Sequence, residues 1–293
     1  MTTSVGTIDV QTLFSLDGRI ALVTGAGSGV GSYVAHGFAL AGAKRVYITG
    51  RRADALKRTA ALHPAIIPIP GDVSTKAGCL SLVEAFEKSE RAAGVQEPLS
   101  LDVLVNNAGI FSNDGTWDKD ASPEAISAAL LQAEDKDWAQ VFSVNVASLQ
   151  FMSAAFLPHL ARAANMAGGK REGRGCIINN TSIAALYTSR WSQTHIYSAS
   201  KAAAESLTQN LASKFTALGV RVNSIAIGNI PSELNNTSNP NSMISKRGAL
   251  VPIGRVGNQE DMVGAVVYLA SRAGSFVSGA CLKIEGGILV GAQ

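Results

Sequence analysis

The chain has 293 residues, of which 46% are hydrophobic and 16% charged, and its formal net charge is +3. A composition this apolar excludes a disordered chain, and the length is within the range of a single α/β domain. The mildly basic charge comes without a long Lys/Arg run or a basic patch interleaved with aromatic residues, so we expect no nucleic-acid partner.

The first half of the chain alternates strand patterns with helix patterns. Residues 1–17 are polar and form a loose lead-in. The expected strands are apolar runs without alternation, which is typical of strands buried on both faces. They cover 19–24, 45–49, 65–69 and 101–105, and the helices cover 29–42, 53–62 and 75–93. Ser74 has the side chain of an N-cap for the third helix.

The second half continues the alternation. We expect a helix from Pro123, a long helix over 137–164 and a basic, glycine-rich loop over 165–175. The remaining strands cover 176–180, 220–225 and 280–284, and the remaining helices cover 194–217 and 259–271. This order predicts an α/β fold with a doubly wound parallel sheet (a Rossmann fold). We expect about seven strands, helices on both faces and a single domain over 1–293.

A Ser- and Asn-rich insertion follows the strand at 220–225. It covers 232–250 and contains Pro240. Ligands of open α/β sheets bind beyond the carboxyl ends of the strands, and loops there often carry function. We therefore expect a substrate lid over 229–250.

The first strand runs into a glycine-rich turn and a helix. Gly25, Gly29 and Gly31 form the pattern TGxxxGxG, one residue wider than GxGxxG, which does not occur in the chain. Residues without a Cβ let the backbone approach phosphates, and the helix start offers free N–H groups and a positive dipole end. The motif predicts a site for a nucleotide pyrophosphate, although similar turns also join strands to helices in proteins that hold no ligand.

Glycine and polar residues also lie at the carboxyl ends of the other expected strands. Gly50 with two arginines ends the second strand, Asp72 the third, Asn106-Asn107-Ala108-Gly109 the fourth and Ser182 the fifth. Because the carboxyl ends of parallel strands meet at one edge of the sheet, we expect these residues to line one ligand site.

Tyr197 and Lys201 lie four residues apart on an expected helix and therefore share one face. A lysine ammonium near a phenol lowers the pKa of the phenol, which could then exchange a proton with a carbonyl or alcohol oxygen. Ser182 could hydrogen-bond the same oxygen. The alternative is an ordinary Tyr/Lys pair on a helix surface.

Arg51 and Arg52 bear on the type of cofactor. A site for NAD usually places Asp or Glu at the end of the second strand to hold the ribose 2′-hydroxyl, whereas Gly50 stands there in this chain. A guanidinium suits a 2′-phosphate, so we expect NADP(H). The alternative is a solvated helix start.

The histidines, the cysteines and the lengths of the apolar runs favour neither a metal site nor a membrane span. His36, His63, His159 and His195 lack ligand spacing, so we expect no metal site. The three cysteines form no CxxC, which favours small buried side chains in a reducing compartment. We find no signal-peptide pattern and no run of about 18 apolar residues, so we expect a cytoplasmic protein without a membrane span.

Taken together, the motifs resemble those of the classical short-chain dehydrogenase/reductase family over about residues 16–290. They are Thr24-Gly25 with Gly29-Val30-Gly31, Asp72-Val73, Asn106-Asn107-Ala108-Gly109, Asn145, Ser182 and Tyr197-Ser198-Ala199-Ser200-Lys201. The resemblance implies that Tyr197 is the catalytic acid/base and that Ser182 positions the substrate oxygen. Lys201 would hold the nicotinamide ribose and lower the tyrosine pKa. Asn145 would bend its helix and hold a water that relays protons.

The resemblance also implies a cofactor site and an assembly. The expected cofactor-binding residues are Gly25, Ser28, Gly29, Val30, Arg51, Arg52, Asp72, Val73, Asn107, Ala108, Gly109, Tyr197, Lys201, Gly228, Ile230 and Ser232. Members of the family are commonly dimers or tetramers. Their interfaces would correspond here to the helices at 137–164 and 194–217 and to the last helix and strand.

Several positions depart from the family pattern. Ile227-Gly228 stands where Pro-Gly is usual, Ser232 replaces a threonine that contacts the nicotinamide amide, and Glu285 replaces an aspartate. These changes bear on the substrate pocket rather than on the reaction. We expect an NADP(H)-dependent oxidoreductase that reduces a ketone, with a small carbonyl or alcohol as its substrate. The alternatives are an NAD-dependent alcohol or polyol dehydrogenase and a nucleotide-binding scaffold without turnover.

Overall fold

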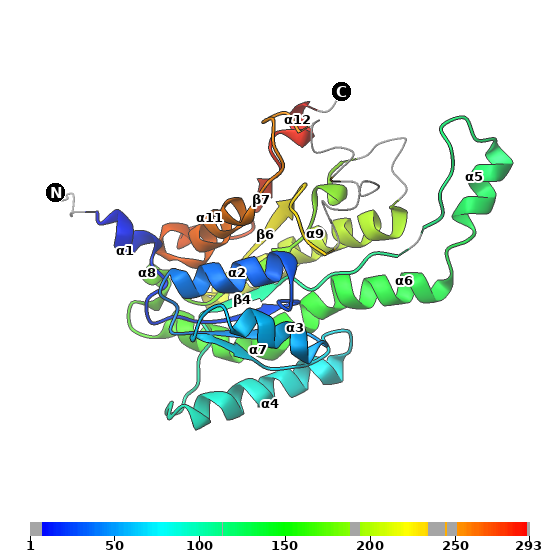
Figure 1. Cartoon of the computed structure of the whole chain (residues 1–293). Coiled ribbons are helices and arrows are strands. Elements are labelled where there is room, and N and C mark those ends of the chain that lie inside the picture. Colours follow the sequence, from blue (N-terminus) through cyan, green and yellow to red (C-terminus); the bar gives the residue numbers. More distant parts are fainter. Residues whose placement is uncertain (1–7, 113, 188–193, 234–243, 245–250, 292–293) are drawn as a thin grey trace.

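The computed structural model describes residues 8–112, 114–187, 194–233, 244 and 251–291. Seven strands within these residues form one parallel sheet in the order β3-β2-β1-β4-β5-β6-β7, with helices on both faces (Figure 1). The strands are β1 Ile20–Thr24, β2 Arg45–Thr49, β3 Ile66–Pro68, β4 Val103–Asn106, β5 Cys176–Asn180, β6 Arg221–Ile227 and β7 Cys281–Ile284. The predicted doubly wound parallel sheet is confirmed. The strand order reverses between β1 and β4, and a crevice at such a reversal is where ligands bind.

Two hydrophobic cores sandwich the sheet. On one face pack α2 Gly29–Leu40, α3 Ala53–Ala60 and α11 Gln259–Ala270, and on the other pack α4 Lys76–Ala92, α7 Ser148–Asn165 and α9 His195–Phe215. Side chains alternate between the cores along each strand: Ala21 and Val23 of β1 face α2 and α11, whereas Ile20 and Leu22 face α4 and α7. Burial on both faces explains the unbroken apolar runs of the strands.

The start of the chain is more ordered than predicted. Within the expected lead-in, residues Val10–Phe14 form helix α1, and Asp9 caps it by accepting a hydrogen bond from the N–H of Gln11. Leu16 is fully buried in the first core. The prediction of a loose segment is therefore wrong from residue 9 onward, because an apolar side chain anchors it.

The N-cap of α4 also differs from the prediction. Thr75, not Ser74, accepts the hydrogen bond from the N–H of Gly78. The N–H of Ser74 instead donates to the carboxylate of Asp72 at 2.9 Å. The Asx turn at Asp72 thus delays the helix start by one residue.

The predicted loop at 165–175 contains a short helix, α8 Gly169–Glu172. Arg174, which follows this helix, is only partly exposed, and its Nη1 contacts Oδ1 of the buried Asp102 at 2.7 Å. The other oxygen of Asp102 accepts a hydrogen bond from the N–H of Ile20 at 2.8 Å. This ion pair ties the segment before β5 to the start of β1.

The long helix predicted over 137–164 is interrupted. Helix α6 spans Asp135–Phe142, a π-helical turn spans Ser143–Ala147, and α7 follows. A single π turn inserted in an α-helix is frequent at functional sites. By length and composition, the whole stretch Asp135–Asn165 could also cross a membrane. Met152 and Phe156 of this stretch are buried in the second core, as expected of a core helix, and the cytoplasmic location stays a prediction.

The remaining described elements are short. Helix α5 spans Pro123–Leu130, as the proline predicted, and α12 spans Ile288–Gly291. The 3₁₀ turns are Ile183–Ala185, Thr216–Leu218 and Arg272–Gly274. Trp191 and most of the predicted lid, 234–243 and 245–250, lie outside the described residues.

Candidate active site

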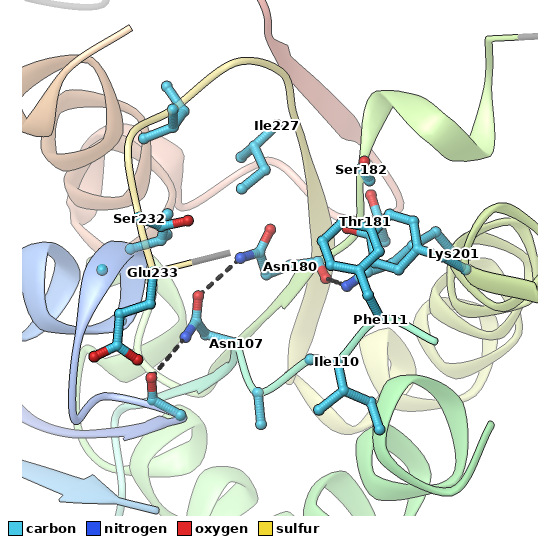
Figure 2. A pocket seen from close by; sticks show the side chains of 18 of the residues that line it. Asn107, Ile110, Phe111, Asn180, Thr181, Ser182, Lys201, Ile227, Ser232 and Glu233 are labelled. Atoms are coloured by element: carbon cyan, nitrogen blue, oxygen red, sulfur yellow. Dashed lines mark hydrogen bonds between the residues drawn. The ribbon is translucent and has the colours of Figure 1, made fainter. Parts of the chain in front are cut away.

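A cavity of about 910 Å³ opens at the carboxyl ends of the strands. Figure 2 shows it from close by, with Lys201 and Ser182 at one end and Ser232 and Glu233 at the other. Every residue predicted for cofactor binding lines this pocket, and so does Ser182. Asn145 is fully buried behind the lining. The edge of the sheet therefore brings together residues that lie far apart in the sequence.

The glycines of the first turn serve packing as much as ligand approach. Gly25 has φ +64°, and a Cβ there would lie 2.7 Å from Cα of Ala108, after β4. A Cβ on Gly31 would lie 2.5 Å from Nδ2 of Asn107. These two glycines are required because the turn packs directly on the end of β4.

The start of α2 suits a pyrophosphate. Ser28 is its N-cap residue, yet its side chain makes no capping hydrogen bond. The N–H groups of the first helical turn, at Gly29 and Val30, lie at the wall of the pocket without that cap. A helix start of this kind binds anions through its N–H groups and its dipole. The turn therefore fits the phosphates of a dinucleotide.

At the same end of the pocket, Arg51 and Arg52 follow β2. Both line the pocket, as do Asp72 and Val73 after β3. Arg52 is not free: its Nη2 contacts Oε2 of Glu233 at 2.6 Å and donates to Oγ of Ser28 at 3.3 Å. Arg51 is exposed. The two arginines predicted for a 2′-phosphate thus differ in their surroundings.

Asparagines connect the ends of three strands. Nδ2 of Asn107 donates to the carbonyl of Thr24 at 3.0 Å, and its Oδ1 accepts from Nδ2 of Asn180 at 2.8 Å (Figure 2). The backbone N–H groups of Asn107 and Ala108 both donate to Oγ1 of Thr24. This network holds the floor of the pocket between β1, β4 and β5.

The other end of the pocket holds the expected catalytic group. The Ser182 hydroxyl lies close enough to the phenol of Tyr197 to lower its pKa, and both residues line the pocket. Nζ of Lys201 donates to the carbonyl of Asn180 at 2.7 Å and lies 5.6 Å from the centre of the Tyr197 ring. Helix α9 carries both side chains on one face, and β5 delivers the serine. The predicted Ser/Tyr/Lys cluster therefore forms in space.

The ionisation of this cluster differs from the prediction. Burial raises the pKa of Tyr197 to about 12, against a smaller lowering by the Ser182 hydroxyl. Burial also lowers the pKa of Lys201 to about 8. The predicted lowering of the tyrosine pKa by Lys201 is therefore wrong for the chain by itself, because desolvation of the phenol outweighs the contribution that lowers its pKa.

Asn145 lies in the π-helical turn, as its predicted role in bending the helix requires. Its Oδ1 accepts from the N–H of Ile110 at 2.9 Å, and its Nδ2 donates to the carbonyl of Ile110 and to Oγ of Ser200, both at 3.0 Å. The side chain joins the segment after β4 to the catalytic helix. The water relay stays a prediction.

Three residues at this end of the pocket, near Tyr197 in the fold, were not singled out from the sequence. The Phe111 ring lies 4.0 Å from the Tyr197 ring, centre to centre. The carboxylate of Asp114, which is almost fully buried, accepts a hydrogen bond from the N–H of Ile196 at 2.7 Å. Asn180 is the last residue of β5, two positions before Ser182. A polar side chain on an otherwise buried strand is a sequence feature that could have identified it.

Within the described residues, no three His, Cys, Asp or Glu side chains lie together in a way that could hold a metal ion. Cys79 and Cys176 are buried and Cys281 is partly buried, and none of the three forms a disulfide. The absence of a metal from the reaction stays a prediction.

Comparison with known proteins gives a consistent family. A family model described as Enoyl-(Acyl carrier protein) reductase matches residues 25–289. The chain is 36% identical over 286 residues to the short-chain dehydrogenase/reductase PhomF of Diaporthe leptostromiformis, covering 94% of this chain and 93% of that protein. It is 35% identical to the rhamnolipids biosynthesis 3-oxoacyl-[acyl-carrier-protein] reductase of Pseudomonas aeruginosa, covering 94% and 97%.

Solved structures agree with the sequence relatives. The Pseudomonas aeruginosa RhlG/NADP active-site complex matches with a TM-score of 0.78 and 31% identity, covering 95% of this chain and 99% of that chain. A 7α-hydroxysteroid dehydrogenase complexed with NADH matches with a TM-score of 0.77 and 26% identity, covering 96% and 98%. Similar folds thus hold either nicotinamide cofactor.

Proposed function

The chain belongs to the short-chain dehydrogenase/reductase family, and from that premise we propose that it is an NADP(H)-dependent oxidoreductase that reduces a ketone to a secondary alcohol. One observation carries the proposal: a half-buried tyrosine, beside the Ser182 hydroxyl and four residues from Lys201, lies in the pocket that also contains the glycine turn suited to an anion. A protein that only bound a nucleotide would not require this tyrosine geometry.

The reaction divides between the cofactor and the chain. The nicotinamide would supply the hydride. Tyr197 would donate its phenolic proton to the carbonyl oxygen, and the Ser182 hydroxyl would hold that oxygen in place. Lys201 in its charged form would bind ribose hydroxyls and stabilise the phenolate left after the proton transfer.

The reductive direction is proposed from the pocket lining and from a relative. Tyr197 carries its proton at neutral pH in the chain by itself, as a proton donor must. Oxidation of an alcohol would need the phenolate as a base. The related 3-oxoacyl reductase is named for a ketone substrate, and the apolar side chains Phe111, Ile183 and Ile227 in the lining suit a substrate with an apolar part.

The preference for NADP(H) rests on the end of β2. Gly50 stands where an acidic side chain would hold a 2′-hydroxyl, and Arg51 and Arg52 follow at the wall of the pocket. The similar RhlG structure was solved as a complex with NADP. An NAD-dependent alcohol or polyol dehydrogenase is the alternative, since one similar structure holds NADH.

The first experiment titrates the purified protein with NADPH and with NADH by fluorescence. It then measures oxidation of each cofactor with a panel of ketones, and reduction of NADP⁺ and NAD⁺ with a panel of alcohols and polyols. Tight NADPH binding with turnover of a ketone is the expected result. Binding of NADH alone, with oxidation of polyols, would favour the alternative dehydrogenase. Binding without turnover of any carbonyl or alcohol would favour a scaffold.

The role of Tyr197 is tested by Tyr197→Phe. We expect kcat to fall by about 100-fold or more, since the proton donor is lost, with little change in the Kd for NADPH. Tyr268→Phe on α11 is the matched control, because it removes the same atom outside the pocket lining and should leave both values unchanged. Turnover that survives Tyr197→Phe would contradict the acid role.

A further inference from the structure

We propose that Glu233 determines cofactor specificity by competing with the cofactor 2′-phosphate for Arg52, so that NADP(H) opens a contact that NAD(H) leaves intact. This inference rests on the proposed function, because it concerns the same pocket. It assigns a role to a residue that the sequence motifs left without one.

The contact joins three segments that are far apart in the sequence. Arg52 is the N-cap residue of α3 after β2, Ser28 belongs to the glycine turn, and Glu233 follows the predicted nicotinamide contact Ser232. Both carboxylate oxygens of Glu233 face the guanidinium, at 2.6 and 3.5 Å. In Figure 2 Glu233 lies at the end of the pocket opposite Lys201. The carboxylate therefore occupies the guanidinium fork that a phosphate would need.

The backbone of the same segment lies on the glycine turn. A Cβ on Gly29 would be 2.8 Å from Cβ of Ser232 and 3.7 Å from the N of Glu233. Residues 232 and 233 thus lie directly against Gly29, beside the helix start that fits a pyrophosphate. A dinucleotide bound at this helix start would therefore lie next to the contact between Arg52 and Glu233.

The charge balance favours displacement by a phosphate. Hydrogen bonds from Arg52 and Ser28 lower the pKa of Glu233, so its carboxylate is ionised at neutral pH. The side chains of Arg52 and Glu233 are 63% and 55% exposed, and ion pairs this exposed are weak. A phosphate monoester carries up to two charges and can replace the single charge of a carboxylate. A 2′-hydroxyl carries none, so NAD(H) has no charge with which to displace the carboxylate and leaves the contact between Arg52 and Glu233 intact.

The test measures Kd values for NADPH and NADH by fluorescence titration, with no turnover, in the full chain. The variants are Glu233→Gln, Arg52→Gln and the double variant. Glu124→Gln on α5 is the control, since it removes an equally exposed carboxylate outside the pocket lining. Glutamine keeps the shape of the side chain and removes its charge.

We expect Glu233→Gln to tighten NADPH binding about fivefold, to change NADH binding less than about twofold, and to lose its effect on NADPH in the Arg52→Gln background. Unchanged or weaker NADPH binding in Glu233→Gln would overturn the competition. An equal gain for both cofactors would also overturn it, because the effect would then be independent of the 2′-phosphate. If the wild-type chain binds NADPH and reduces ketones in these cases, the proposed function stands. If it binds no NADPH, both proposals fall.

Discussion

At the scale of single residues, burial decides the ionisation of Tyr197 and Lys201, the proposed catalytic pair. Tyr197 and Lys201 are both desolvated, and desolvation favours the neutral form of each. The pKa of the tyrosine rises from 10.0 to about 12 and that of the lysine falls from 10.5 to about 8, so two groups with similar ordinary pKa values are driven apart. The site is thereby set to keep a proton on the phenol, while the lysine titrates near the physiological range.

This ionisation predicts how cofactor binding depends on pH. With a pKa of about 8, Lys201 is charged below pH 8 and neutral above it. We expect the affinity for NADPH to fall as pH rises from 7 to 9, because the ammonium that binds ribose hydroxyls loses its proton. Fluorescence titration across this range measures the change.

Lys201→Met is the control for the pH profile. This variant should bind NADPH more weakly at pH 7, and its affinity should not fall between pH 7 and 9.

The stability of the wild-type chain should depend on pH in the opposite sense, increasing as pH rises. The folded-state pKa of Lys201 lies below the ordinary value of 10.5, so protonation of the buried lysine costs stability below pH 8. The free energy of unfolding should therefore rise between pH 8 and 10.5. A pH-independent affinity in the wild-type chain would contradict the assignment.

At the scale of elements, helix α9, which carries Tyr197 and Lys201, is held at its start by a residue from another segment. Asp114, in the segment after β4, accepts the N–H of Ile196 in the first turn of α9, and its other oxygen accepts from the hydroxyl of Ser112. Asn145 ties the same segment to Ser200 further along the helix. These contacts position Tyr197, which follows Ile196 directly.

Asp114→Ala should therefore reduce both stability and activity. The N–H of Ile196 would lose its partner in a buried site, at a cost of about 1–2 kcal/mol. For a chain of this size that lowers the midpoint of thermal unfolding by roughly 2–8 °C. We also expect kcat to fall, because Tyr197 would be less well held. Calorimetry and ketone reduction measure the two effects.

Two further variants test whether loss of this hydrogen bond causes the effects of Asp114→Ala. Asp114→Asn keeps an oxygen that can accept the hydrogen bond and should lose less stability than Asp114→Ala. Asp120→Ala, at an exposed aspartate of the same connection, should change neither the melting midpoint nor kcat. Equal stability of Asp114→Ala and the wild-type chain would show that the contact does not support the helix.

At the scale of the whole molecule, we expect a homodimer or homotetramer. Phe276, between α11 and β7, is fully exposed, and Val290 in α12 is 90% exposed. These residues lie beside the last helix and strand, which the family resemblance assigns to an interface. Exposed apolar side chains of this size often mark an association surface.

The assembly prediction is tested by light scattering after size exclusion. The wild-type chain should elute as two or four copies of the 30.3 kDa chain, and Phe276→Asp should elute as a smaller species, since a buried charge without a partner opposes association. Leu62→Asp, at an exposed apolar residue after α3, is the control and should keep the wild-type assembly. A monomeric wild-type chain would refute the prediction.

The sequence by itself determined the sheet and the outline of the pocket. Apolar runs without alternation identified the buried strands, and parallel strands necessarily bring their carboxyl ends to one edge. For this reason the glycine turn, Asp72, Asn107 and Ser182 could be placed together from the printed residues alone. Such signals are local, or follow from one simple rule of topology.

The tertiary structure alone decided which partners these residues have. Arg174 reaches Asp102, Glu233 holds Arg52, and the enclosed setting of Tyr197 raises its pKa instead of lowering it. Each of these outcomes depends on side chains that lie far apart in sequence, or on the extent of desolvation. No pattern along the chain records those quantities, because contact and burial are properties of the packed molecule.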